Sequence, residues 1–246
     1  MTKNNIKDIQ KLESIAINLL NSGNVTHGLG RSLRGLLGEI AVYKNHINSL
    51  PRLKSYLNTQ SYKNVQVGGG KHFLKGFINI DIVPPADIIF DVREGLPLKT
   101  NSTDFIFSEH FLEHIDYPLS VNKFISECYR ILKKEGKLVI GVPDSQLIIS
   151  AYVKKDKKLW EQMIKKWYSN RNCLEHFNTY IDLVNYHFRD QDDDFKYHPH
   201  FWAYDFEKLK SLLTGVGFIK VKKWKFNKAI ANPKRKWGSL YVEALK

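Results

Sequence analysis

The stretch Val65-Gln66-Val67-Gly68-Gly69-Gly70 decides the fold of this 246-residue chain, because a short apolar run there ends in three glycines. Four more short runs, rich in β-branched and aromatic residues, follow at 77–81, 88–91, 104–110 and 137–144. Runs of this kind, bounded by glycine, proline or charged residues, are typical of buried strands in a mostly parallel sheet. The sequence therefore predicts an α/β fold.

Glycine and acidic residues stand where these strands end, which is where parallel sheets bind their ligands. Glycines 68–70 allow a sharp turn and a close approach of backbone N–H groups to a ligand. Asp81 and Asp91 end the next two strands, where carboxylates can bind ribose hydroxyls and an adenine amino group respectively. A glycine turn alone is more often structural, but two acids at successive strand ends favour a site. Phe73 takes the third glycine position of the dinucleotide motif, which argues against NAD or FAD.

Composition limits the compartment and the partners. Hydrophobic residues make up 43% of the chain, enough for a packed core, yet no run approaches the ~20 apolar residues of a membrane span. The N-terminus lacks a signal-peptide pattern. Cys128 and Cys173 belong to no CxxC pair, which fits a reducing compartment. We therefore expect a cytoplasmic protein.

The net charge of +13 raises the question of an anionic partner. A basic chain can bind nucleic acid, anionic lipid or phosphorylated substrates. Most lysines are dispersed singly, which favours a solvated surface instead. The densest basic region, 220–236, begins with the alternation expected of the exposed face of an edge strand.

Helical spacing of apolar residues predicts two helices before the sheet, in 6–20 and 33–47. We expect Gly28-Leu29-Gly30 to separate them and Pro51 to start a third, short helix. Residues 1–60 are accordingly predicted to form a helical N-terminal extension that packs on the sheet edge or covers the pocket.

Residues 61–246 are predicted to form the main domain, with a helical cap inserted around 150–200. A strongly helical pattern at 117–132 follows the fourth strand. Two final strands, at 218–226 and 239–245, are expected to pair with each other in antiparallel orientation.

Several short segments of the chain together carry a resemblance to a known family. They are Val65–Gly70, 76–81, 86–93, 96–98, 104–106, 108–114, 127–133 and 142–144, with a tail at 200–205 and 217–218. Together they resemble class I S-adenosylmethionine-dependent methyltransferases, most closely the compact type-11-like group. The resemblance covers about 80 contiguous residues and leaves out residues 1–60. It implies a Rossmann-like sheet, mostly parallel with an antiparallel last strand, and S-adenosylmethionine as cofactor.

The resemblance also implies the roles of individual residues. In this family the glycine loop contacts the methionine part of the cofactor, the acid after the second strand holds the ribose, and the segment after the third strand flanks adenine. Gly69 stands where the family usually has cysteine. The implied cofactor-binding residues are Gly68, Gly69, Gly70, Asp81, Ile82, Asp91, Val92 and Ser108.

Transfer to a hydroxyl needs a base, and Ser108-Glu109-His110 follows the fourth strand, which faces the methyl group in this fold. His110 is the first candidate for the base. Glu109 is assigned to hold the methionine ammonium or to orient a histidine. His114 lies one helical turn from His110 and could share its face, but we interpret Glu113 and His114 as capping residues at a helix start.

A second group of histidines lies in His198-Pro199-His200-Phe201-Trp202. His200 and Trp202, together with Asp144, are predicted to form the wall of the acceptor pocket. Two histidines and nearby aspartates could bind a metal, but Pro199 gives no regular chelating geometry, so no metal site is predicted.

These assignments predict methyl transfer to a small polar acceptor, a hydroxyl of a sugar, nucleotide-sugar or phosphorylated glycan precursor. The sugar is implied by the resemblance alone. Two alternatives stay open: a nucleic-acid methyltransferase, and a non-catalytic binding or assembly protein that keeps the fold. The first is disfavoured because 108–111 lacks the Asn/Asp-Pro-Pro-Tyr motif that amino-methylating nucleic-acid enzymes of this fold often carry.

Overall fold

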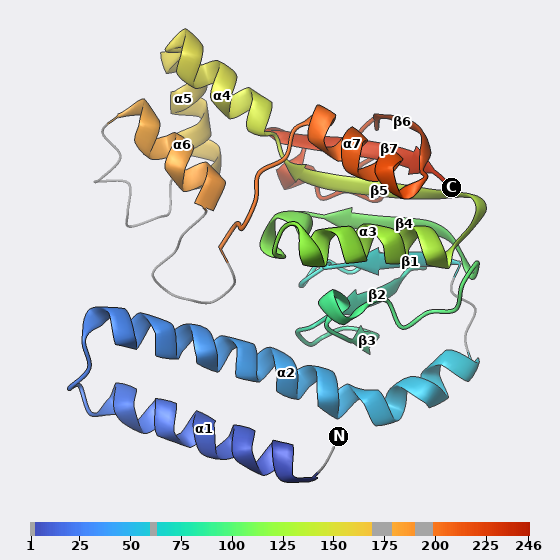
Figure 1. Cartoon of the computed structure of the whole chain (residues 1–246). Helices are drawn as coiled ribbons and strands as arrows, with labels where there is room; N and C mark the ends of the chain where they lie inside the picture. The colour runs from blue at the N-terminus through green and yellow to red at the C-terminus, as the bar shows by residue number, and fades with distance from the viewer. Residues whose placement is uncertain (1–2, 60–62, 169–178, 190–198) are drawn as a thin grey trace.

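The computed structural model describes residues 3–59, 63–168, 179–189 and 199–246, and it is built around a seven-stranded sheet (Figure 1). The strands are β1 (Asn64–Val67), β2 (Ile78–Asp81), β3 (Ile88–Ile89), β4 (Thr103–Glu109), β5 (Leu132–Pro143), β6 (Ile219–Lys223) and β7 (Ser239–Leu245). Their order is β3-β2-β1-β4-β5-β7-β6. The first five run parallel, and β7 is antiparallel to both β5 and β6. The predicted mostly parallel sheet with an antiparallel last strand is confirmed.

The register of the central strands brings their carboxyl ends together. Val67 of β1 is level with Ile80 of β2 on one side and with Ser108 of β4 on the other. The glycine turn that follows Val67 therefore lies between the end of β2 and the end of β4. This is the edge of the sheet at which α/β proteins bind ligands.

Helices α3 (Leu119–Ile131) and α7 (Phe206–Val216) cover one face of the sheet (Figure 1). The apolar side of α3 is fully buried there, as its spacing predicts, and packs with Ile106 and Ile140 in the main core. On the opposite face Phe107 and Val139 pack with Tyr241 in a smaller cluster. Alternate residues of one strand thus enter different cores, as the strand period of two requires.

Two long helices precede the sheet, α1 (Lys3–Asn21) and α2 (His27–Thr59), and an ion pair of 3.0 Å joins Lys44 to Glu13 between them. The predicted break at Gly28 and Gly30 is wrong, because both glycines lie in the first turn of α2. Thr26 precedes that turn, and its hydroxyl accepts a hydrogen bond from the backbone N–H of Leu29, as an N-cap does.

Pro51 does not start a new helix, contrary to the prediction, and lies inside α2. Helix α2 bends in its C-terminal half (Figure 1), which is the usual result when a proline interrupts the backbone hydrogen bonds. The helix runs along the β3 side of the sheet. Its Asn45 side chain donates to the carbonyl of Ile82, and its His46 Nδ1 accepts from the backbone N–H of Asp91.

Helices α4 (Ser145–Lys154), α5 (Lys157–Met163) and α6 (Tyr180–Arg189) follow β5 and lie beyond its carboxyl end (Figure 1). A π-helical turn at Ile164–Tyr168 extends α5. These elements have a small core of their own around Trp160, Met163 and Tyr186. These helices fall largely in the range 150–200, and the helical cap predicted there stays a prediction, since residues 169–178 and 190–198, His198 among them, lie outside the described residues.

Strand β6 forms one edge of the sheet, as predicted for the basic region, but its exposed residues do not alternate, since both Lys222 and Lys223 are exposed. Among the described residues, none of the helices combines the length and apolar composition that a bilayer crossing requires.

Candidate cofactor and acceptor site

A cavity of about 1330 Å³ opens at the carboxyl ends of the parallel strands. Its walls come from α2, the glycine turn, the ends of β2 and β4, the cap and the segment before β7. The predicted site residues on these walls are Gly68, Gly69, Gly70, Asp81, Ile82, Asp91, Val92, His110 and His200. Ligand pockets usually measure ~300–1,000 Å³, so this cavity can hold a cofactor and a second molecule together.

The glycine turn exposes its backbone to the cavity. Gly68 and Gly70 have φ angles of 68° and 55°, in the left-handed region that favours glycine. A Cβ on Gly70 would meet no atom within 4 Å, so its backbone borders open space. The carboxylate of Asp81 accepts hydrogen bonds from the N–H groups of Gly70 and Val83, at 2.8 and 3.0 Å. A bare backbone turn beside an oriented carboxylate fits the methionine and ribose parts of S-adenosylmethionine.

Gly68 has less room than Gly70, which gives a prediction about stability. A Cβ on Gly68 would overlap both the ring and the Cβ of Phe111, whereas a Cβ on Gly70 meets nothing. Because overlap and left-handed strain add, Gly68→Ala should lower the free energy of unfolding by about 2–4 kcal/mol. Gly70→Ala is the matched control, since it carries the strain alone and should cost about 1–2 kcal/mol. Urea denaturation measures both, and equal losses would exclude the overlap with Phe111 as a cause.

The carboxylate of Asp91 forms an ion pair within the protein. Both of its oxygens accept hydrogen bonds from the guanidinium of Arg93, which also pairs with Glu39 of α2 at 2.8 Å. These two carboxylates raise the pKa of Arg93 above its usual range. Ile82 and Val92 lie on the same wall of the cavity. The adenine side of the predicted site is therefore formed by residues that an ion pair ties to α2.

His110 lies directly after β4 and lines the cavity, with a φ of 51°. Its Nε2 is 2.8 Å from Oγ of Ser239, and its Nδ1 is 3.4 Å from Oε1 of Glu113. Burial, and then the charge of Arg235, hold the pKa of His110 well below 6.5. The imidazole is therefore neutral at physiological pH and can accept a proton.

Ser108 and Glu109 do not reach the described walls of the cavity. Ser108 is fully buried, and Glu109 is 4% exposed. The carboxylate of Glu109 accepts hydrogen bonds from the hydroxyl of Tyr241 at 2.6 Å and from the backbone N–H of Asn232 at 3.1 Å. The cofactor and catalytic roles predicted for these two residues stay predictions.

Glu113 and His114 are not caps, contrary to our interpretation. They belong to a short 3-10 turn, Leu112–His114, whose N-cap residue is Phe111 and has no side-chain capping bond. Glu113 is instead buried, 1% exposed, with its carboxylate beside His110. His114 lines the cavity.

The three residues predicted for the acceptor wall do not line one common cavity in the structure. His200 lines the large cavity and a small neighbouring one, whereas Trp202 lines the small one and stacks on Tyr117 at a ring distance of 4.6 Å. Asp144 caps α4 by accepting a hydrogen bond from the N–H of Leu147. Of the three, His200 is the residue that the structure brings to the large cavity.

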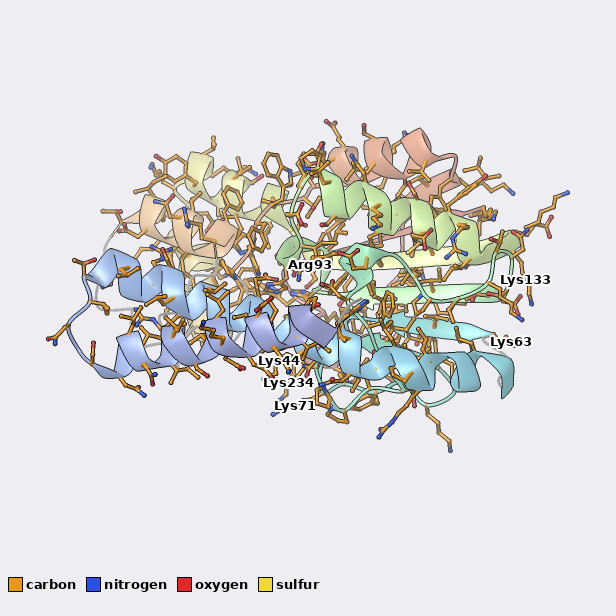
Figure 2. All side chains as sticks on the ribbon, turned by 60° about the horizontal axis from the view of Figure 1, so that its bottom comes forward. Lys44, Lys63, Lys71, Arg93, Lys133 and Lys234 are labelled. Atoms are coloured by element: carbon orange, nitrogen blue, oxygen red, sulfur yellow. The ribbon has the colours of Figure 1, made fainter. Side chains whose placement is uncertain are left out.

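Sequence analysis missed a set of cations that line the large cavity. They are Arg31, Arg34, Lys71, Arg93, Lys234 and Arg235. Lys234 falls in the basic region 220–236, but nothing in the sequence places that region beside α2 or the glycine turn. Figure 2 labels Lys71, Arg93 and Lys234, together with Lys63 and Lys133 at the other end of the sheet.

The comparisons with known proteins bear on this site. Residues 78–140 match a family model described as a methyltransferase domain. An uncharacterized protein of Methanocaldococcus jannaschii is 28% identical in an alignment 145 residues long, and the alignment covers 54% of this chain and 65% of that protein. This chain therefore matches slightly less than two thirds of the length of that relative.

Solved structures of S-adenosylmethionine-dependent methyltransferases align with most of the chain. An S-adenosylmethionine-dependent methyltransferase of Methanosarcina mazei is 15% identical, with a TM-score of 0.47, and the alignment covers 80% of this chain and 97% of that one. An enzyme of the same description from Archaeoglobus fulgidus is 18% identical, with a TM-score of 0.41 and coverage of 80% and 91%.

The family match covers β2, β3, β4 and most of β5, and it includes Asp81, whereas β1 and the glycine turn precede it. The match identifies residues 78–140 as similar to a methyltransferase domain of the type-11 group, and the resemblance of the chain to class I S-adenosylmethionine-dependent methyltransferases rests on this segment.

Proposed function

We propose that the protein methylates a hydroxyl of a small anionic acceptor, such as a sugar phosphate, a nucleotide-sugar or another phosphorylated glycan precursor. The charge of the large cavity carries this proposal. Six Lys or Arg side chains line it, against two acidic side chains, Asp81 and Asp91, among the described residues. Cations gathered in a partly enclosed cavity attract and orient phosphate groups. The volume beyond the needs of the cofactor gives such an acceptor room.

The proposed chemistry depends mainly on alignment and on the removal of one proton. S-adenosylmethionine supplies an electrophilic methyl group when bound, and the protein must hold the acceptor oxygen in line with it and exclude water. His110 takes the proton of the hydroxyl as the oxygen attacks. Nε2 is 2.8 Å from the hydroxyl of Ser239, and the acceptor hydroxyl would replace Ser239 as the partner of this nitrogen. Glu113 beside Nδ1 then stabilises the imidazolium that forms.

The acceptor class has a direct test. Purified protein is incubated with S-adenosylmethionine and a panel of sugars, sugar phosphates, nucleotide-sugars and short RNA and DNA, and methylated products are identified by mass spectrometry. Methylation of a phosphorylated sugar is the expected result. Methylation of RNA or DNA instead, with binding that weakens steeply as salt rises, would contradict the proposal. Tight binding of S-adenosylhomocysteine without any transfer would favour a non-catalytic protein.

The cations of the cavity give a prediction about affinity for the acceptor. Removing one charge that contacts a phosphate should cost about 1.5–3 kcal/mol of binding. Lys71→Ala and Lys234→Ala should therefore raise the KM for a phosphorylated acceptor at least about tenfold and leave kcat near its original value. Lys63→Ala is the matched control, because Lys63 precedes β1 at the opposite end of the sheet (Figure 2). Steady-state kinetics measure the KM of all three variants. If Lys71→Ala and Lys234→Ala have the same KM as Lys63→Ala, these two lysines have no role in binding the acceptor.

A further inference from the structure

Three metal-ligand side chains meet beside the large cavity. Glu113 and His114 come from the turn that follows β4, and His200 comes from the segment before α7. One ligand atom from each lies within 4.8 Å of the other two. Bonds of ~2.0–2.2 Å to a common ion place ligand atoms at most about 4.4 Å apart, so a small side-chain shift brings all three into reach.

The backbone holds the two contributing segments against each other. The N–H of Phe201 donates to the carbonyl of Glu113 at 2.7 Å, and the N–H of His200 donates to the carbonyl of Arg189 at 2.8 Å. The rings of His114 and His200 meet edge to face, with centroids 4.8 Å apart. Backbone hydrogen bonds therefore fix the relative positions of the segments that carry the three side chains.

The hydrogen bond of His200 selects the tautomer that a metal needs. Nδ1 of His200 is 2.9 Å from the carbonyl oxygen of His187. A carbonyl can only accept, so Nδ1 carries the hydrogen and Nε2 carries the lone pair. Metal-binding histidines usually donate their other N–H in this way, which fixes the ring orientation.

A small cavity beside the cluster adds an independent observation. Glu113 and His200 line it together with His187, Ser145 and Tyr204. Nε2 of His187, Oγ of Ser145 and the hydroxyl of Tyr204 are buried and have no hydrogen-bond partner among the described residues. Buried polar atoms normally have a partner, and the cavity of about 10 Å³ that these three residues line has room for about one water molecule beside the cluster.

We propose that Glu113, His114 and His200 bind one divalent first-row transition metal ion. Two imidazoles and a carboxylate are a donor set that zinc and iron sites use, and three protein ligands leave coordination positions for other groups. Because His114 and His200 also line the large cavity, an open position faces the acceptor. The further role of this ion, holding and acidifying the acceptor hydroxyl, rests on the proposed function, whereas the binding of the ion does not.

Metal binding is tested with the full chain after removal of bound metal with a chelator. Titration with Co²⁺, whose visible absorption reports coordination, should show one ion per chain, which Zn²⁺ then displaces. Glu113→Gln and His200→Gln should each weaken Co²⁺ binding at least about tenfold. His27→Gln is the matched control, because His27 is exposed at the start of α2 and lies outside the cluster.

Folding and cofactor binding are measured in parallel. Since Glu113 is buried, each variant is compared by melting temperature and by affinity for S-adenosylhomocysteine, and His114→Gln supplies a third ligand variant. Folded wild-type protein that binds no Co²⁺ or Zn²⁺ would overturn the proposal, as would folded ligand variants that bind as tightly as wild type.

The role of the ion in transfer has its own readout. Chelation should lower turnover and leave affinity for S-adenosylhomocysteine unchanged. Turnover that is indifferent to chelation, in protein shown to bind the ion, would overturn the acceptor-holding role. Failure of the methyltransferase proposal itself would instead appear as no transfer with or without the metal.

Discussion

Replacing His110 with alanine should lower turnover by ~10²–10⁴, the usual contribution of a general base, while affinity for S-adenosylhomocysteine stays within a few-fold. His110 lies at the end of β4 on the cavity wall, and its Nε2 faces the hydroxyl of Ser239. Burial keeps its imidazole neutral, because it lowers the pKa well below 6.5. Single-turnover rates with an identified acceptor measure the effect.

A purely structural role for His110 predicts a different pattern. The backbone N–H of His110 donates to the carbonyl of Gly141, and this bond survives the substitution, whereas the contacts to Ser239 and Glu113 are lost. A structural histidine would therefore change the melting temperature and leave turnover per folded molecule almost unchanged. Ser239→Ala is the matched comparison, since it removes the same hydrogen bond and keeps the imidazole. Near wild-type turnover in folded His110→Ala would refute the assignment.

Asp81→Ala should weaken binding of S-adenosylhomocysteine by ~1.5–3 kcal/mol, or roughly 10- to 150-fold. The substitution removes the proposed charged acceptor for the ribose hydroxyls. It also removes the bonds that orient Gly70 and Val83, so the backbone turn loses a support at the same time. Isothermal titration calorimetry measures the change.

Two controls separate these effects of Asp81. Asp81→Asn keeps the shape and one acceptor oxygen, and it should lie between wild type and alanine. Asp87→Ala removes a nearby acid that binds the N–H of Asn79 and does not line the large cavity, so it should leave affinity unchanged. Unaltered affinity in folded Asp81→Ala, or binding of NAD in place of S-adenosylhomocysteine, would contradict the proposed cofactor geometry.

The sheet could be predicted from the sequence because buried parallel strands are short apolar runs whose ends carry glycine or acid. The boundaries of helices α1 and α2 could not be predicted in this way. Gly28, Gly30 and Pro51 were interpreted as breaks, but propensity is a weak preference that packing along a 33-residue helix overrides.

The strand period limits which residues at the end of β4 can face the cavity together. Ser108, Glu109 and His110 are all predicted to belong to the site, but successive residues of a strand point to opposite faces, and the roles of Ser108 and Glu109 stay predictions. Ser108 and Glu109 are accordingly buried within the protein, and His110 reaches the cavity because the chain turns there with a positive φ. The sequence does not predict that turn, since a positive φ is uncommon at any residue other than glycine.

Residues brought together from distant parts of the chain could not be found by spacing. The sequence groups His200 with its neighbour His198, but the structure places His200 against His114. In the same way Arg31 of α2 and Lys234 before β7 line one cavity, although about 200 residues separate them. Only the tertiary fold contains this information.

The ion pair between Arg93 and Glu39 links the attachment of helix α2 to the binding of the cofactor. Arg93 holds Asp91 on the proposed adenine side and Glu39 on α2, so local opening of that helix removes one wall of the binding site. A ligand that binds only the closed form stabilises it by RT ln(1 + [L]/Kd), and the same free energy opposes detachment of α2. Occupancy of the site and attachment of α2 are therefore thermodynamically linked, so a change in one equilibrium shifts the other.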